Sequence, residues 1–252
     1  MLPQITLSDD QIMSFKKTGY LIIRSGLPKP QMKTIDKWTN ELLALPEESG
    51  KHWVYYEQNH DKEKKKIVSR IENIRTFHYG FKILSDCLRN PISQLMEEDA
   101  ILFKEKINFK MPGGTGFKPH QDSQAGWDAY ANFFISAFVS IDESTLENGC
   151  LEICGGRHVN GLHTSWKPLT KDDMIDMEFI PILTQPGDVI FFDSFTPHQS
   201  APNLSKSPRR IYYATYNAKS SGDKSKQYYR DKHKSYPPDI DQKDNVSYVY
   251  RV

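Results

Sequence analysis

Residues 117–122 read FKPHQD, and the last three of them, His120, Gln121 and Asp122, are followed far along the chain by His198 and Arg209. Side chains two residues apart on a β-strand point to the same face, so one extended segment can present His120 and Asp122 together. Two imidazoles and one carboxylate can hold Fe(II) on one face and leave its other coordination positions open. We therefore expect His120, Asp122 and His198 to be the ligands of an iron centre.

The sequence around this motif has the pattern of a mainly β protein. From residue 101 onward, short runs rich in β-branched and aromatic residues alternate with turn residues: LFKEKINFK, FKPHQD, ANFFISAFVSID, CLEIC, EFIPIL, VIFFDSF and RRIYYATYN. Many short strands separated by Gly, Pro and Asn indicate a sandwich or barrel rather than alternating βαβ units. The sequence shows no internal repeat.

The first hundred residues have a more helical pattern. Apolar side chains recur at helical spacing in segments 32–45 and 81–96, and the second segment contains Pro91, which can interrupt or restart a helix. We expect an α+β protein that is mainly β with flanking helices. A single domain spanning 1–252 would comprise a mainly helical flank at 1–100, a β core at 101–217 and a polar surface tail at 218–252.

Composition excludes several classes of protein. The 252 residues contain 33 Lys and Arg against 32 Asp and Glu, a formal net charge of +1, so no global field favours nucleic acid or an anionic membrane. No apolar run is long enough to span a bilayer, and the N-terminus lacks a signal pattern. The odd set of Cys87, Cys150 and Cys154 forms no disulfide framework. We expect a cytoplasmic monomer or homodimer that acts on a small molecule.

Arg209 suggests that an anion lies beside the metal. Iron held by three protein ligands has positions left for a bidentate 2-oxo acid and dioxygen. The far carboxylate of a dicarboxylate cosubstrate would be buried, and a buried carboxylate needs a fork of donors such as a guanidinium. Arg209 lies eleven residues after His198, across a turn-rich segment, and Ser200 could add a hydroxyl donor. Arg210 would point to the opposite face.

Four stretches together resemble the phytanoyl-CoA dioxygenase-like family of Fe(II)- and 2-oxoglutarate-dependent oxygenases: HQD at 120–122, NGCLEICGGRH at 148–158, GDVIFFDSFTPH at 187–198 and NLSKSPRRIY at 203–212. The resemblance runs from about residue 7 to the C-terminus. The family includes phytanoyl-CoA hydroxylase, ectoine hydroxylase and a 2-aminoethylphosphonate hydroxylase. Membership implies a jelly-roll core, also called a double-stranded β-helix, with helices packed on one side.

The resemblance also implies roles for single residues. By position, His120, Asp122 and His198 match the iron ligands. Arg209 and Ser200 match the residues that hold the distal carboxylate of 2-oxoglutarate, and Asn108 matches an asparagine that contacts the same cosubstrate. The implied reaction uses dioxygen, hydroxylates an unactivated C–H bond and releases succinate and CO2. Related halogenases have a small residue at the position of Asp122, so halogenation is disfavoured.

Contacts to a substrate are expected from three places in the chain. Lys104 and Lys106 share a strand face with Asn108 if that strand is regular, which makes Lys106 a candidate contact for an anionic group; a solvated edge lysine is the alternative. Trp127 and Tyr130 follow Asp122 and could form a wall or lid, or could serve packing alone. Tyr213 shares the strand face of Arg209 and could line the same pocket.

Three functions remain open from the sequence. The first is hydroxylation of a small polar or anionic metabolite, for example a phosphonate such as 2-aminoethylphosphonate. The second is a natural-product tailoring oxygenase that acts on a larger scaffold, with the aromatic segment WVYYEQN at 53–59 forming the cavity. The third, from another class, is a catalytically silent jelly-roll that binds a metal or ligand.

Overall fold

The structure is a computed structural model, and it describes residues 2–59 and 65–248. The helices are α1 (Asp9–Thr18), α2 (Lys29–Leu43), α3 (Tyr79–Met96) and α4 (Ser225–Ser235). The strands are β1 (Tyr20–Ile23), β2 (Trp53–Gln58), β3 (Lys66–Glu72), β4 (Ala100–Lys110), β5 (Phe117–His120), β6 (Phe134–Ser140), β7 (Leu151–Ile153), β8 (Ile180–Ile182), β9 (Val189–Asp193), β10 (His198–Ser200) and β11 (Arg209–Ala218).

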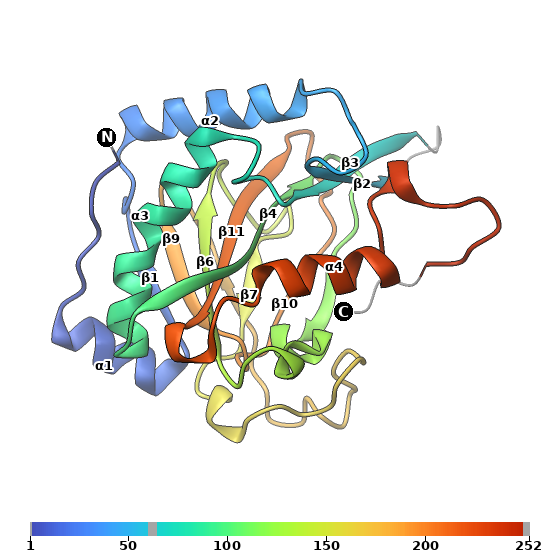
Figure 1. Cartoon of the computed structure of the whole chain (residues 1–252). Coiled ribbons are helices and arrows are strands. Elements are labelled where there is room, and N and C mark those ends of the chain that lie inside the picture. Colours follow the sequence, from blue (N-terminus) through green and yellow to red (C-terminus); the bar gives the residue numbers. More distant parts are fainter. Residues whose placement is uncertain (1, 60–64, 249–252) are drawn as a thin grey trace.

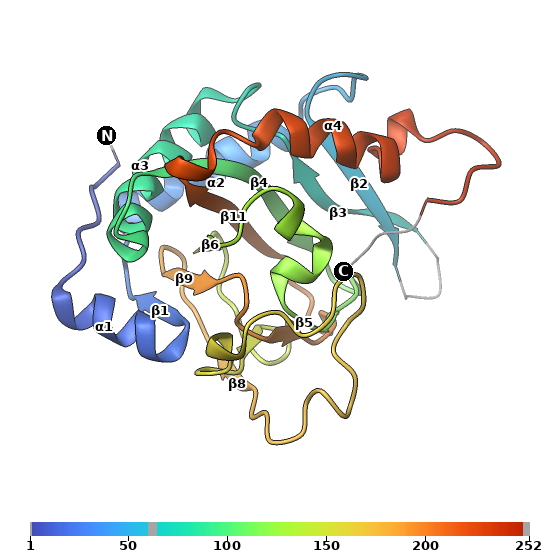
Figure 2. The ribbon, with the colours of Figure 1, turned by 60° about the horizontal axis from the view of Figure 1, so that its bottom comes forward.

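The strands form two sheets in which neighbours are antiparallel. The larger sheet has seven strands in the order β1-β9-β6-β11-β4-β3-β2, and the smaller has four in the order β5-β10-β7-β8. Helices α2 and α3 cover one side of the larger sheet, while α4 lies on the other side, in front of β4 (Figures 1 and 2). This arrangement is the expected jelly-roll with flanking helices.

Strands β4 and β11 are neighbours in the middle of the larger sheet. Successive side chains on each strand point alternately to the two faces of the sheet, so one set packs in the core and the other faces the smaller sheet. Side chains such as Ile107, Phe109 and Tyr212 point to the helices and join Leu84 and Leu88 of α3 in the main apolar core. The register pairs Arg209 with Lys110, Ile211 with Asn108, Tyr213 with Lys106 and Thr215 with Lys104. These eight residues therefore share the opposite face, which turns toward the smaller sheet.

The first hundred residues contain strands as well as helices. Where the structure describes them, they contain three strands besides α1, α2 and α3. Strand β1 lies at one edge of the larger sheet, and β2 and β3 extend that sheet beyond β4. Pro91 lies inside α3 and does not end it; its ring is buried against the core, and the helix continues to Met96. The register of β3 on β4 pairs Arg70 with Asn108 and Glu72 with Lys106, so both side chains join the face that turns toward the smaller sheet.

The segment after β11 includes helix α4, which packs against β4. Tyr228 of α4 is buried in an aromatic cluster with Phe103, Trp127 and Phe134, and the Phe103 and Tyr228 ring centroids lie 4.7 Å apart. The polar tail thus contributes an element to the interior of the protein. Across residues 2–59 and 65–248, no helix has the length and apolar character needed to cross a membrane.

Candidate active site

Three metal-binding side chains converge between the two sheets. One ligand atom each from His120, Asp122 and His198 lies within 4.8 Å of the other two, and each histidine Nε2 is 3.9 Å from Oδ1 of Asp122. The side chains are 12%, 20% and 8% exposed, respectively. Two nitrogen donors and one carboxylate oxygen form the facial set that suits Fe(II) with open positions. The residues present therefore fit an iron centre.

Hydrogen bonds to backbone carbonyl groups orient both imidazoles. Nδ1 of His120 lies 2.7 Å from the carbonyl oxygen of Lys118, and Nδ1 of His198 lies 3.0 Å from that of Thr196. A carbonyl can only accept, so each Nδ1 carries the proton and each Nε2 keeps a free lone pair for a metal. Burial, followed by the charge of His198, lowers the pKa of His120 to about 3, which keeps this imidazole neutral.

Strand pairing brings the two histidines together. In the smaller sheet, β5 and β10 are antiparallel, and His198 is directly opposite His120. Asp122 lies just beyond β5, where Gln121 keeps an extended backbone and a 3₁₀ turn (Asp122–Ala125) begins. The buried Gln121 amide donates to the carbonyl oxygens of Gly161 and Phe195, which fixes this corner.

Two hydroxyl groups that sequence reasoning missed support Asp122. Ser136 Oγ donates to Asp122 Oδ2 at 3.3 Å and lies 2.8 Å from Thr215 Oγ1. Ser136 and Thr215 face each other on β6 and β11, and both are buried. Such outer contacts hold a ligating carboxylate in position. The signal was present in FISAFV at 134–139, where Ser136 interrupts an otherwise apolar run.

Arg209 is a buried cation with free donors. Arg209 is 2% exposed, and its Nε and Nη1 atoms are buried without a hydrogen-bond partner in the described part of the chain. Burial lowers the pKa of Arg209. An unpartnered buried guanidinium is costly unless a ligand anion completes it. Arg210 points the other way, where its Nη2 is 2.7 Å from Oδ1 of Asp142, as the strand alternation predicts.

Ser200 lines the same cavity as Arg209, and its hydroxyl already accepts one hydrogen bond. Lys110 Nζ donates to Ser200 Oγ at 2.7 Å and also to the carbonyl oxygens of Ala201 at 2.6 Å and Gly149 at 3.2 Å. Because Lys110 fills an acceptor site of the hydroxyl, the Ser200 proton is left to donate elsewhere. Burial, followed by the charge of Arg209, lowers the pKa of Lys110 to about 6.

One cavity of about 350 Å³ brings these groups together, and every site residue expected from the sequence lines it. The residues are His120, Asp122, His198, Arg209, Ser200, Asn108, Lys106, Trp127, Tyr130 and Tyr213. The side-chain oxygen of Asn108 is buried without a partner in the described residues. Trp127 is 2% exposed and packs edge-on against Phe103 and Phe134, so it combines the wall and packing roles.

The cavity also includes residues that the sequence did not indicate. Glu72 comes from β3, and Tyr228, Asp231 and Lys232 come from α4. Tyr130 donates its hydroxyl to Asp231 Oδ2 at 3.1 Å, which joins the loop after Asp122 to this helix. The cavity residues of α4, at positions 228, 231, 232 and 235, lie on one face of the helix, but α4 is polar all round and no apolar stripe marks that face in the sequence.

A second cavity of about 620 Å³ lies next to the first. The two share Asn108, Phe117, His120, Trp166 and Tyr236 as lining residues. Tyr56 and Glu57 of β2 line this second cavity and are not among the lining residues of the first. The aromatic segment 53–59 therefore borders the neighbouring space.

Comparison with known proteins agrees with this geometry. Residues 15–211 match the family model described as Phytanoyl-CoA dioxygenase (PhyH). The chain is 37% identical to the methylphosphonate hydroxylase of Gimesia maris over 239 residues, covering 92% of this chain and 88% of the relative. It is 33% identical to the 2-aminoethylphosphonate dioxygenase of the uncultured bacterium HF130_AEPn_1 over 251 residues, covering 96% and 93%.

Solved structures share the fold at lower identity. EctD from S. alaskensis, crystallised with 2-oxoglutarate and 5-hydroxyectoine, superposes with a TM-score of 0.73 at 21% identity, covering 85% of this chain and 77% of that one. The α-ketoglutarate-dependent epimerase SnoN from nogalamycin biosynthesis superposes with a TM-score of 0.66 at 17% identity, covering 83% and 82%.

Proposed function

The chain belongs to the phytanoyl-CoA dioxygenase family of Fe(II)- and 2-oxoglutarate-dependent oxygenases, and we propose that it hydroxylates a C–H bond of a small organophosphonate. Two relatives that are at least 33% identical and aligned over more than nine-tenths of this chain are named for phosphonate substrates. A single cavity of about 350 Å³ joins the metal triad, an unpartnered guanidinium and several lysines, and this arrangement carries the assignment. A cavity of this size suits a small molecule.

Each end of the cavity has a role in this proposal. His120, Asp122 and His198 hold the iron through Nε2 and carboxylate oxygen atoms. Arg209 receives the distal carboxylate of 2-oxoglutarate, with Ser200 as an additional donor and Asn108 as a further contact to the cosubstrate. Lys106, Trp127, Tyr130 and Tyr213 are the proposed substrate contacts.

Bound iron with 2-oxoglutarate and dioxygen supplies the oxidation: the cosubstrate becomes succinate and CO2, one oxygen atom enters succinate and the other enters the substrate as hydroxyl. The protein contributes position and exclusion of water. Buried donors on Arg209 and Ser200 fix the cosubstrate, while Trp127 and Phe117 provide apolar walls. Asp122 fills the coordination position that halide would need, so the expected outcome is hydroxylation.

Succinate release is the direct test. The purified protein with Fe(II), 2-oxoglutarate and dioxygen should release succinate in step with loss of methylphosphonate or 2-aminoethylphosphonate. His120→Ala should show no turnover while keeping its circular dichroism spectrum. Failure of the wild-type protein to convert 2-oxoglutarate with any small phosphonate would overturn the substrate assignment.

The neighbouring cavity of about 620 Å³ favours a second candidate, a tailoring oxygenase for a larger scaffold. A larger substrate could extend past Phe117 and Trp166, which line both cavities. Turnover that responds to bulky molecules and ignores small phosphonates would select this candidate. A silent binding protein is disfavoured because the triad and Arg209 are all in place; it would bind 2-oxoglutarate and metal yet never form succinate.

The setting of the enzyme is also a proposal. Cys87, Cys150 and Cys154 are free thiols, which supports a reducing, cytoplasmic location. The proposed partner is a small molecule, with the protein acting as a monomer or homodimer.

A further inference from the structure

Two lysines on β4 point into the cavity with free ammonium groups. Lys104 and Lys106 are half-buried and line the cavity, and neither donates a hydrogen bond to an acceptor or pairs with a carboxylate within the part of the chain that the structure describes. Lys104 Nζ instead lies 3.9 Å from the centroid of the Trp127 ring. Partly buried ammonium groups without acceptors are costly. Their donors are therefore available to a bound anion.

A third lysine reaches the same space from α4. Lys232 Nζ donates to Glu72 Oε2, and Arg70 Nε lies 3.1 Å from the other oxygen of this carboxylate. Burial raises the pKa of Glu72, but the charges of Lys232, Arg70 and the two β4 lysines outweigh it and lower the pKa to about 2. Glu72 thus stays ionised and is already shared by two cations.

The β4 lysines lie close to the metal ligands. Their charges act on the carboxylate of Asp122, and the charge of Lys106 also acts on His120. The strand register explains this nearness, because Lys104 is opposite Thr215, which contacts the Ser136 hydroxyl that donates to Asp122. An anionic group held by these lysines would therefore place its neighbouring carbon beside the metal site.

The charges around the substrate side favour a dianion. When Lys104, Lys106, Lys232 and Arg70 are all protonated, they outnumber the two carboxylates, Glu72 and Asp231, by two positive charges. Burial lowers the pKa of Lys104 and of Lys232, so a bound anion favours the protonated form of both. Neutralising the metal site requires none of these four cations. The three positive charges of Fe(II) and Arg209 would balance the three negative charges of Asp122 and a 2-oxoglutarate dianion. Unbalanced positive charge in a half-closed cavity attracts anions.

Several aromatic side chains of the cavity already contact cations of the protein. Lys104 lies 5.5 Å from the centroid of the Tyr228 ring, Lys232 lies 5.8 Å from the same ring, and Lys106 lies 5.3 Å from that of Tyr213. Aromatic faces are the usual receptors for a ligand ammonium group. These ring faces are therefore taken, and the lysines beside them favour the negative end of a substrate.

We propose that Lys104, Lys106 and Lys232 form a receptor for a tetrahedral dianion, and that the phosphonate group of the substrate binds there with its adjacent carbon toward the metal ligands. The identification of the anion as a phosphonate rests on the proposed function. The receptor itself rests on the three ammonium groups and their position beside Asp122.

Calorimetric binding to the Mn²⁺- and 2-oxoglutarate-loaded protein tests the receptor, with methylphosphonate and inorganic phosphate as probes. Lys104→Met and Lys106→Met keep side-chain length and remove the charge. Each should weaken binding of both probes about 10- to 100-fold, since a hydrogen bond to a charged group is worth this much. Lys104→Arg should retain most of the binding. Lys37→Met, which removes the same charge from the exposed face of α2, is the matched control.

The outcomes separate the receptor from the proposed function. Variants that bind both probes within threefold of the wild-type protein overturn the receptor, even if phosphonates are turned over. A wild-type protein that binds neither probe also overturns it. If no phosphonate yields succinate but inorganic phosphate binds in a lysine-dependent way, the substrate assignment fails and the receptor stands. Unchanged affinity for 2-oxoglutarate in the Lys→Met variants excludes general damage.

Discussion

Replacing Arg209 by Met should weaken the binding of 2-oxoglutarate about 100-fold without harming the fold. Arg209 is 2% exposed, and two of its three guanidinium nitrogens have no partner in the described residues. Methionine has a similar length, fills the same space and carries no charge. The variant therefore isolates the contribution of the guanidinium to the cosubstrate.

The size of the effect follows from the two free donors. A hydrogen bond to a charged group contributes about 1.5 kcal/mol or more, so two bonds to one carboxylate contribute about 3 kcal/mol, and their loss weakens binding about 100-fold. At a concentration 100 times its dissociation constant, 2-oxoglutarate adds about 2.7 kcal/mol to the free energy of unfolding of the wild-type protein. At the same concentration, the variant should gain only about 0.4 kcal/mol.

Thermal unfolding in the presence of Mn²⁺, which supports binding without turnover, measures this difference. For a protein of this length, about 2.7 kcal/mol corresponds to a rise in Tm of about 5–10 °C, against less than about 2 °C for the variant. Without 2-oxoglutarate, Arg209→Met should unfold at the wild-type temperature or above it, because an unpartnered buried cation has been removed.

Arg210→Met is the matched control on the opposite face of β11. It breaks the pairs of Arg210 with Asp142 and Asp36, so the Tm without ligand should fall while the rise with 2-oxoglutarate stays intact. An Arg209→Met protein that keeps the full ligand-induced rise would refute the assignment of Arg209 to the cosubstrate.

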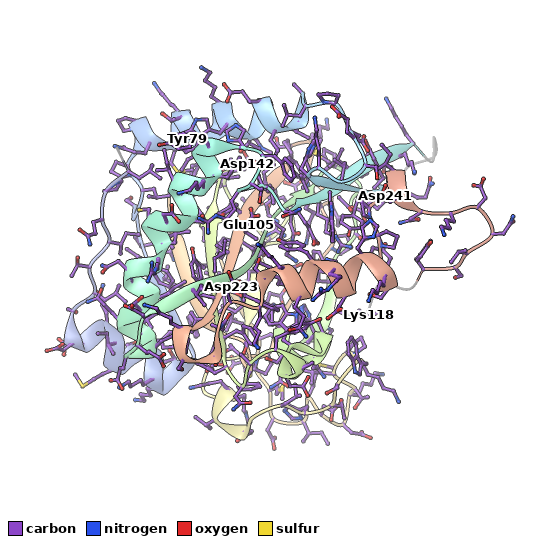
Figure 3. All side chains as sticks on the ribbon, viewed as in Figure 1. Tyr79, Glu105, Lys118, Asp142, Asp223 and Asp241 are labelled. Atoms are coloured by element: carbon purple, nitrogen blue, oxygen red, sulfur yellow. The ribbon has the colours of Figure 1, made fainter. Side chains whose placement is uncertain are left out.

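Three further predictions concern the metal site and the core. Ser136→Ala removes the hydroxyl that donates to Asp122 and should weaken Mn²⁺ binding about tenfold or more in a metal titration; unchanged affinity would contradict its supporting role. His120→Ala should leave no metal binding by the same titration, and residual turnover would show that the ligand assignment is wrong. Glu105, labelled in Figure 3, belongs to β4. Burial, opposed by the backbone N–H groups of Arg75 and Ile74, raises the pKa of Glu105 to about 7, so the folded state holds this proton more tightly than the unfolded state does. The free energy of unfolding should therefore fall by about 3 kcal/mol as the pH rises from about 4.5 to about 7, and urea unfolding of Glu105→Gln should lack this loss; equal pH dependence in both proteins would count against it.

The convergence of His120, Asp122 and His198 could be predicted because potential metal ligands are concentrated in short motifs. His120 and Asp122 are two residues apart, and His198 closely follows the apolar run VIFFDSF at 189–195. The structure places His198 at the start of the separate strand β10, where pairing with β5 brings it opposite His120. The strand face of Lys106 and Asn108 followed from simple alternation, and the register with β11 agrees with it. The sequence of short strands and turns indicated a sandwich or barrel, and the resemblance to the family implied that it is a jelly-roll.

The remaining cavity residues depend on contacts that local pattern does not encode. Glu72 belongs to a strand in a region where helical spacing was the stronger signal. Its place in the cavity depends on the pairing of β3 with β4, which sets Glu72 opposite Lys106. Asp231 and Lys232 lie on a helix that is polar all round, which usually indicates solvent exposure. Only tertiary packing of Tyr228 against Phe103 shows which face of α4 turns inward.

Helix α4 is encoded after the last strand of the core, yet it supplies one wall of the cavity. Recombination at a single junction downstream of β11 would exchange that wall and leave the oxidising machinery untouched. Descendants of one ancestral gene could thus diversify in what they accept while inheriting the same way of activating dioxygen. For the same reason, a library confined to residues 225–236 is the economical starting point for altering selectivity by directed evolution.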